Sequence, residues 1–174
     1  MASYSEVLQT MLAMVLFAII MTISTKMMFM NSQHSVRSEA EKKAISIAQS
    51  YINKARILPF DNNTKSGTPS NIPEDFSRCE PEEGTNENTF DDFDDYHRFS
   101  ETIDWYKEED AFSVKIKVLY VSGPDYEIAN GSIGSSSGDR TVFKKMQVSV
   151  SSQYLTDADG KPIEVTHSYL RRYY

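Results

Sequence analysis

The stretch SYSEVLQTMLAMVLFAIIMTIST, residues 3–25, decides the fold of this 174-residue chain. No residue from Val7 to Thr25 carries a formal charge, and apolar residues resume directly after Lys26. At about 1.5 Å of rise per residue, a helix over residues 7–30 reaches roughly the 30 Å of a bilayer core. The sequence therefore predicts one membrane-spanning helix, with the Lys26 ammonium able to reach the interface through its long side chain.

A cleaved secretory signal is the competing interpretation of this segment. Such a signal has a basic start, a shorter apolar core and a small-residue cleavage site, and none of these features is present. Positive-inside counting places Lys26 and the basic residues after it in the cytoplasm. A short basic leader removed before Met1 or Ala2 would reverse this orientation.

Helical periodicity continues beyond the apolar segment. Apolar residues recur at spacings of three and four, which is typical of one helix face: Val36, Ala40, Ala44, Ile47, Tyr51, Ala55 and Leu58. Neither Gly nor Pro occurs between Ser3 and Leu58, so nothing in the sequence ends the helix before Pro59. We predict one helix over residues 3–58: residues 1–30 form a hydrophobic membrane or filament-core segment, and 31–58 an amphipathic continuation that packs on its own chain.

The remaining residues indicate a connecting region followed by a sheet. Residues 59–100 are polar and acidic and predict a long connection with little regular structure. Apolar and polar residues then alternate in three segments, as in half-buried strands: 112–120, 146–151 and 163–169. Asp-Gly turn chemistry within 156–162 predicts a hairpin, and 130–139 predicts a flexible loop. We therefore expect an α+β fold in which residues 101–174 form an antiparallel sheet that covers the apolar stripe of the helix.

Composition and motifs limit the classes of function. The net charge of −7 argues against nucleic acid as a partner. Cys79 is the single cysteine, so no intrachain disulfide can form. The three histidines lie far apart in the sequence, which argues against a zinc site. No nucleophile elbow, kinase signature or metalloprotease motif occurs, so we expect no catalytic residues and no enzyme activity.

An acidic cluster is the one candidate for a metal. It consists of Asp91, Asp92, Asp94 and Asp95. Carboxylate oxygens suit Ca²⁺, which takes six to eight oxygen ligands. The favoured alternative is a solvated loop in which the aspartates cap local amides. No other cofactor is expected.

Glu6 is an acid at the head of the apolar run. With Ser3 it forms the Ser-x-x-Glu pattern of a capping box, in which the carboxylate bonds back to the Ser3 amide at the positive end of the helix. The cap does not explain an acid before a helix that is dehydrated on all sides when it packs in an assembly. A neighbouring copy's α-amino group could supply the missing positive charge.

These features together resemble the bacterial type IV pilins and pseudopilins. The resemblance rests on the charge-free helix near the N-terminus, Glu6 at its head, the amphipathic continuation and the small β-domain. FDDFDDYHRFS (90–100), followed by FKKMQVSVSSQYL and GKPIEVTHSYLRR, is similar to minor pilins and pseudopilins, in which an Asp-Asp-x-Asp-Asp-Tyr segment precedes two closing strands. In this family a prepilin peptidase removes a leader, the new N-terminus is usually methylated, and the fifth mature residue is typically glutamate. Glu6 is fifth from Ala2 and sixth from Met1.

This chain also departs from the family pattern. It lacks the usual phenylalanine start, and its helix lacks the Gly and Pro that often mark a melted segment in bacterial pili.

The resemblance implies a structural subunit of an extracellular type IV pilus-like filament. The subunit would wait in the inner membrane, and the pilus assembly machinery would add it to copies of itself in a filament at the cell surface. Glu6 and the N-terminal residues Ala2 or Met1 would set the register between copies, with Ser3 as the helix cap. The helices would pack in the filament core through Leu8, Leu12, Val15, Leu16, Ile19, Ile20 and Ile23.

Two alternatives remain open, and a third is disfavoured. A pseudopilin of type II secretion would form a short periplasmic filament that pushes cargo. A single-pass, membrane-anchored binding module would act as a monomer through its β-domain. A membrane-tethered enzyme ranks third, because no catalytic set of residues is found.

Overall fold

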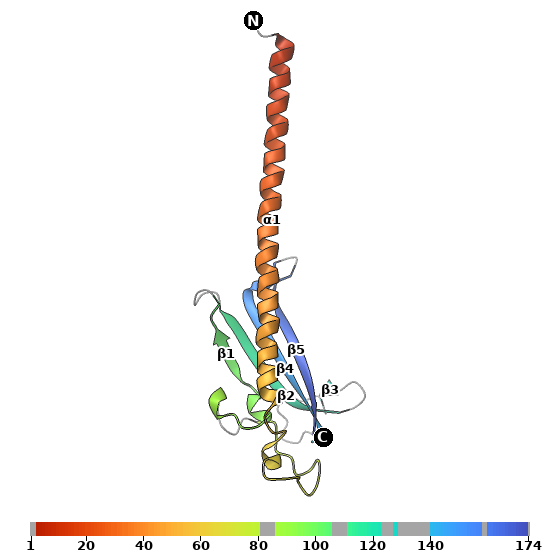
Figure 1. Ribbon diagram of the computed structural model, residues 1–174. Helices are drawn as coiled ribbons and strands as arrows, with labels where there is room; N and C mark the ends of the chain where they lie inside the picture. Colours follow the sequence, from red (N-terminus) through yellow and green to blue (C-terminus); the bar gives the residue numbers. More distant parts are fainter. Residues whose placement is uncertain are drawn as a thin grey trace. The chain divides into compact units, whose positions relative to one another are not determined.

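A computed structural model describes residues 3–80, 86–105, 111–122, 127–128, 140–157 and 160–173 (Figure 1). Over these residues the chain forms one long helix, α1 (Tyr4–Arg56), followed by short 3₁₀-helices and strands. The 3₁₀-helices are η1 (Asn62–Thr64), η2 (Glu87–Thr89) and η3 (Asp94–Tyr96). The strands are β1 (Ser100–Ile103), β2 (Phe112–Ser122), β3 (Glu127–Ile128), β4 (Phe143–Thr156) and β5 (Pro162–Arg172). This order of elements confirms the predicted α+β fold.

The chain divides into two units, Met1–Glu39 and Ala40–Tyr174. In the first unit the large apolar side chains of α1 are exposed, and by length and composition the helix can cross a membrane. The hydroxyl groups of three threonines in this part of the helix form hydrogen bonds within it. Thr10, Thr22 and Thr25 each donate to a backbone carbonyl one turn earlier, at 2.8–2.9 Å. This local pairing suits an apolar surrounding, where an unpaired hydroxyl is costly.

In the second unit α1 buries one stripe against the sheet. The stripe contains four alanines with no exposed surface, at positions 40, 44, 48 and 55, together with Ile47, Tyr51 and Ile52. These small side chains let the helix lie close to the sheet, and the larger ones fill the space on either side. Helical hydrogen bonding ends at Arg56, just before the predicted end at residue 58. The Arg171 guanidinium donates to the Ala55 carbonyl at 3.3 Å and so satisfies one of the free carbonyls at the helix end.

The sheet is antiparallel in the order β1-β2-β4-β5, and β3 pairs with β2. Val114 lies beside Val150, which lies beside Val165, so one face is apolar across the central strands. The alternation predicted for 112–120, 146–151 and 163–169 is confirmed, although β4 begins three residues earlier than expected. β4 and β5 form the predicted hairpin, in which the Gly160 amide donates to the Asp157 carbonyl at 3.1 Å. The predicted loop at 130–139 lies outside the described residues.

The region 59–100 contributes aromatic side chains to the core. As predicted it has little regular structure, yet six aromatic residues are at least nine-tenths buried: Phe60, Phe76, Phe90, Phe93, Tyr96 and Phe99. The Phe90 ring lies 4.9 Å from Tyr96 and 5.5 Å from Phe99 between ring centroids, in edge-to-face contacts. The described residues of this region, 59–80 and 86–100, therefore pack against α1 and β2 rather than running over the surface.

Candidate functional site

The head of α1 holds Glu6 in the predicted cap. The Ser3 amide donates to Glu6 Oε2 at 2.9 Å, and the Glu6 and Val7 amides donate to the Ser3 carbonyl at 2.9 and 3.3 Å. The carboxylate therefore sits at the positive end of the helix dipole while remaining exposed. Met1 and Ala2, the other residues expected to set the register, lie outside the described residues.

The seven residues predicted to pack in a filament core are all exposed on α1. Their exposed fractions range from 50% at Ile19 to 66% at Leu8, and the other five fall between these values. Leu12, Val15, Leu16, Ile20 and Ile23 complete the set. Such an apolar surface is far larger than a soluble monomer normally exposes, and it requires lipid or protein to cover it.

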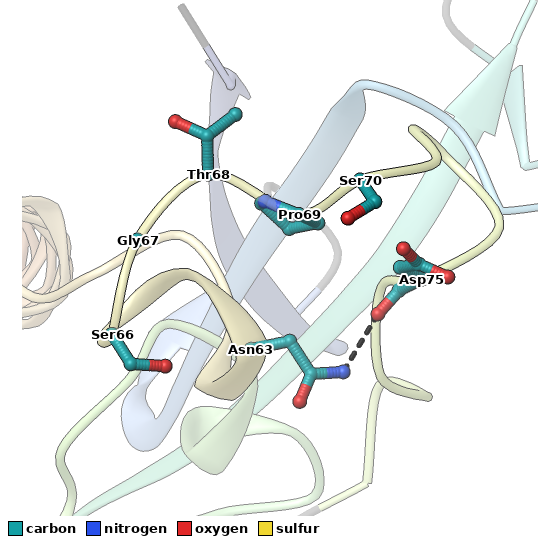
Figure 2. A pocket seen from close by; sticks show the side chains of 7 residues that line it. All are labelled: Asn63, Ser66, Gly67, Thr68, Pro69, Ser70 and Asp75. Carbon is teal, nitrogen blue, oxygen red and sulfur yellow. Dashed lines mark hydrogen bonds between the residues drawn. The ribbon is translucent and has the colours of Figure 1, made fainter.

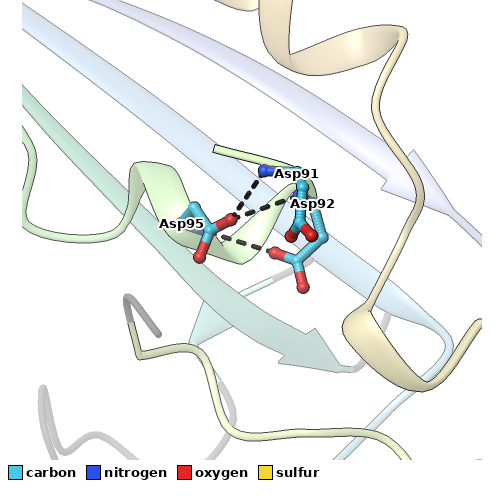
Figure 3. Close-up of side chains that lie close together, drawn as sticks. All are labelled: Asp91, Asp92 and Asp95. Atoms are coloured by element: carbon cyan, nitrogen blue, oxygen red, sulfur yellow. Dashed lines mark hydrogen bonds between the residues drawn. The ribbon is translucent and has the colours of Figure 1, made fainter. Parts of the chain in front are cut away.

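The acidic cluster is brought together only in part. Side-chain oxygens of Asp91, Asp92 and Asp95 lie within 4.8 Å of one another and could hold a metal ion (Figure 3). Asp95 Oδ2 accepts from the Asp91 and Asp92 amides at 3.0 and 3.2 Å. Asp92 Oδ1 accepts from the Asp94 and Asp95 amides at 2.8 and 3.2 Å. The aspartates thus cap local amides, as favoured above.

Two details of that prediction are wrong. The loop is not solvated, since Asp92, Asp94 and Asp95 are at most 3% exposed. Asp94 does not join the other three, because its carboxylate turns to Lys144 on β4. Asp91 in turn pairs with Lys65. Burial, followed by the charge of Asp95, raises the pKa of Asp92. A calcium site at Asp91, Asp92 and Asp95 stays a prediction.

A buried ionic cluster connects three segments of the second unit that are far apart in the sequence. Lys144, with no exposed surface, donates through Nζ to Asp61 Oδ2 at 2.9 Å, to the Phe60 carbonyl at 2.9 Å and to Asp94 Oδ1. Asp61 comes from the segment after α1, Asp94 from η3 and Lys144 from β4. The Ser77 hydroxyl donates to Asp61 at 2.9 Å and lies 3.1 Å from Asp94 Oδ2. Through these contacts the cluster connects η3 and the segment that follows α1 to strand β4 of the sheet.

The charges of this cluster do not balance when all three groups are ionised. Two carboxylates and one ammonium leave one excess negative charge in a buried site, which is unfavourable. Burial raises the pKa of Asp94 to about 7, although Lys144 opposes the shift. Burial also opposes ionisation of Asp61, but Lys144 and the Ser77 and Asn63 amides hold the pKa of Asp61 below its usual value. The two carboxylates outweigh burial at Lys144 and raise its pKa. Near neutral pH the cluster thus pairs an ammonium with the Asp61 carboxylate beside a proton-binding Asp94.

Sequence reasoning missed Lys144, although a signal was present. Lys144 lies two residues before Met146 and so falls on the inward face of the strand, in phase with Met146, Val148 and Val150. A lysine in phase with an apolar face indicates either the end of the strand or a buried cation with acidic partners. Apolar alternation starts the predicted strand at residue 146, which leaves Lys144 outside it.

His97 is a buried titratable group that directly follows η3. Its Nδ1 accepts from the Val118 amide on β2 at 3.2 Å, and the side chain is 3% exposed. Burial, assisted by Arg98, lowers the pKa of His97 below its ordinary 6.5. His34 is exposed and His167 is half-buried on β5, so the described residues bring no two histidines together.

Acidification is therefore expected to destabilise the protein through His97. Its pKa is lower in the folded state, so below pH 6.5 the unfolded state binds the proton more readily and unfolding becomes easier. The stabilisation that uncharged His97 contributes is complete above pH 6.5, and it is lost as the pH falls through the pKa that His97 has in the folded state. We expect His97→Asn, whose Oδ1 can accept the Val118 amide without titrating, to reduce the change in urea midpoint between about pH 8 and about pH 5.5. An equal change in both proteins would contradict this role.

A hollow of about 430 Å³ is lined by Asn63, Asp75 and the loop 66–70 (Figure 2). Asn63 Nδ2 donates to the Asp75 carbonyl at 2.6 Å and closes one side of the loop. Asp75 is its single charged lining residue, and its carboxylate accepts from the Asn71 amide at 2.8 Å. These residues offer neither a nucleophile with a base nor a set of metal ligands, so the hollow supports no catalytic role.

Comparison with known proteins gives no relative from which a function could be transferred. No family model matches the chain, and neither a curated protein nor a solved structure does.

Proposed function

We propose that this chain is a structural subunit of a type IV pilus-like filament. One observation carries the proposal. In the first unit of the chain, α1 exposes large apolar side chains, and its first turn contains the acid Glu6. A membrane anchor needs the apolar surface but not the acid. A helix that passes from lipid into a bundle of identical helices makes use of both.

The proposal assigns the two units of the chain different tasks. Before assembly the apolar part of α1 anchors the subunit in the inner membrane, which suits its length and composition. After extraction by the assembly machinery the same surface packs against copies of itself, and the second unit forms the outside of an extracellular filament. Processing by a prepilin peptidase and methylation of the new N-terminus belong to the same proposal.

Glu6 sets the register between copies in this account. Apolar side chains on a helix tolerate several alignments, because packing between them is not directional. A carboxylate that must meet a neighbour's α-amino group in a dehydrated bundle accepts far fewer alignments. Before a neighbouring copy arrives, the Ser3 amide already donates one hydrogen bond to this carboxylate within the chain.

Two substitutions separate the cap from the intermolecular charge pair. Glu6→Gln keeps a side-chain acceptor for the Ser3 amide, since glutamine also serves in capping boxes, whereas Glu6→Ala removes cap and charge together. We expect both variants to reduce the filament yield by about tenfold or more, because each leaves the neighbour's amino group unpaired. Filament mass in the sheared surface fraction measures the yield, with subunit amounts in the membrane as the control. A Glu6→Gln variant that assembles at the wild-type rate would restrict Glu6 to its capping role.

A further inference from the structure

We propose that Lys144 and Asp94 condense to an intramolecular isopeptide bond, with Asp61 as the proton acceptor. The structure holds the reactants: an amine and two carboxyl groups that meet in one buried cluster. This assignment concerns the second unit alone and does not depend on filament formation.

The positions of the three groups support the assignment. Lys144 Nζ contacts a carboxylate oxygen of Asp94 and lies 2.9 Å from Asp61 Oδ2. None of the three residues is more than 1% exposed. The rings of Phe60 and Tyr120 cover the amine, with centroids 4.5 and 4.9 Å from Nζ. Holding an amine against a carboxyl group in this way replaces a bimolecular encounter with a unimolecular step, and exclusion of bulk water disfavours the reverse hydrolysis.

The hydrogen bonds distinguish the roles of the two acids. Asp61 accepts from the Ser77 amide and hydroxyl, the Asn63 amide and the Tyr120 hydroxyl as well as from Lys144, so its anion is well stabilised. Asp94 has fewer donors: Lys144 donates to it, and the Ser77 hydroxyl, which donates to Asp61, lies 3.1 Å from Asp94 Oδ2. Asp94 is therefore the acid that is protonated, and a neutral carboxylic acid is the form that an amine can attack. Its raised pKa of about 7 agrees with this assignment.

The reaction balances in atoms and charge. Lys144 passes one ammonium proton to the Asp61 carboxylate, and the neutral Nζ attacks Cγ of protonated Asp94. The Nζ–Cγ bond forms, one Cγ–O bond breaks, and the hydroxyl leaves as water with a second proton from Nζ, relayed through Asp61. Of the three ammonium protons and the one on Asp94, one stays on the amide nitrogen, two leave in water and one rests on Asp61. The cluster is neutral before and after the step, so no uncompensated buried charge is created.

The bond would join η3 covalently to β4. The two residues are fifty positions apart in the chain, and the loop that closes between them contains β1 and β2. A covalent closure of this kind restricts the unfolded chain as a disulfide does, in a chain whose single cysteine allows none.

Peptide mapping of the full chain, purified in detergent and denatured, tests the proposal. Trypsin does not cleave after an acylated lysine, so it should cut after Lys145 but not after Lys144. The expected product is residues 141–145 joined to residues 79–98, with the summed mass of the two peptides less one water. The intact chain should also weigh one water less than its sequence, with N-terminal processing determined from the same digest.

Two variants complete the test. Lys144→Arg lacks the amine and should release residues 79–98 at their full mass. Asp61→Asn cannot accept the proton and should leave the bond unformed in protein that keeps the wild-type Trp105 emission; linkage at the wild-type level would overturn the role of Asp61. Complete cleavage after Lys144 in the wild-type chain, together with free 79–98 at full mass, would overturn the isopeptide bond itself.

Discussion

Lys144→Ala is expected to lower the free energy of unfolding by about 3–5 kcal/mol, because removing one partner of a buried ion pair leaves uncompensated charge behind. Here the Asp61 carboxylate loses its cation within the core, and Asp94 loses its contact with the same ammonium. Domains of this size are stable by only about 5–15 kcal/mol, so the loss is a large share of the total. Absence of the covalent link to Asp94 would act in the same direction.

Urea unfolding of the full chain in detergent measures this effect. Trp105 is the single tryptophan and packs against Phe112 and Tyr154, with ring centroids 5.4 and 5.6 Å away, so its emission reports on the second unit. Lys145→Ala is the matched control: it removes the same side chain one position along β4, on the opposite face of the sheet, and should change stability by less than about 0.5 kcal/mol. Equal small losses in both variants would show that the buried cluster contributes little.

Ile19→Lys is expected to remove most of the protein from the membrane. Ile19 lies near the middle of the apolar segment and is half exposed. Replacing isoleucine with lysine at the centre of a membrane helix raises the free energy of insertion by about 3–4 kcal/mol, which lowers the ratio of inserted to non-inserted protein by roughly a hundredfold or more. Alkaline extraction of the membrane fraction measures this ratio.

Ile45→Lys provides the control for this substitution. Ile45 lies on the same helix in the second unit and is 40% exposed. The same chemical change there should leave the membrane fraction unaltered. If Ile19→Lys resisted extraction as fully as Ile45→Lys, the first unit would not be a membrane helix.

Local sequence patterns predicted most of the secondary structure. The helix and the three long strands follow from apolar periods of three to four and of two, which depend only on nearby residues. Glu6 and Ser3 were predicted as a cap for the same reason, since both partners lie within one helical turn. Where the pattern was interrupted by a charged residue, as at Lys144, the predicted strand was too short.

The buried cluster could not be predicted in the same way. Asp61, Asp94 and Lys144 lie on three segments far apart in the chain, and only the packing of η3 and β4 brings them together. The four aspartates read as a solvated loop because acidic residues are seldom buried without a partner. Their partner, Lys144, lies fifty residues beyond Asp94, where no local rule connects them.

Electron microscopy of the sheared surface fraction, with mass spectrometry of the N-terminal peptide, tests the central claim most directly. The claim is that apolar helices from many copies leave the membrane and bundle with one another. The account predicts filaments that contain this chain as a subunit, with a processed and methylated N-terminus at Ala2 or Met1, so that Glu6 is the fifth or sixth mature residue. A chain found solely in the membrane, released by detergent as a monomer while filaments at the surface lack it, would contradict the account.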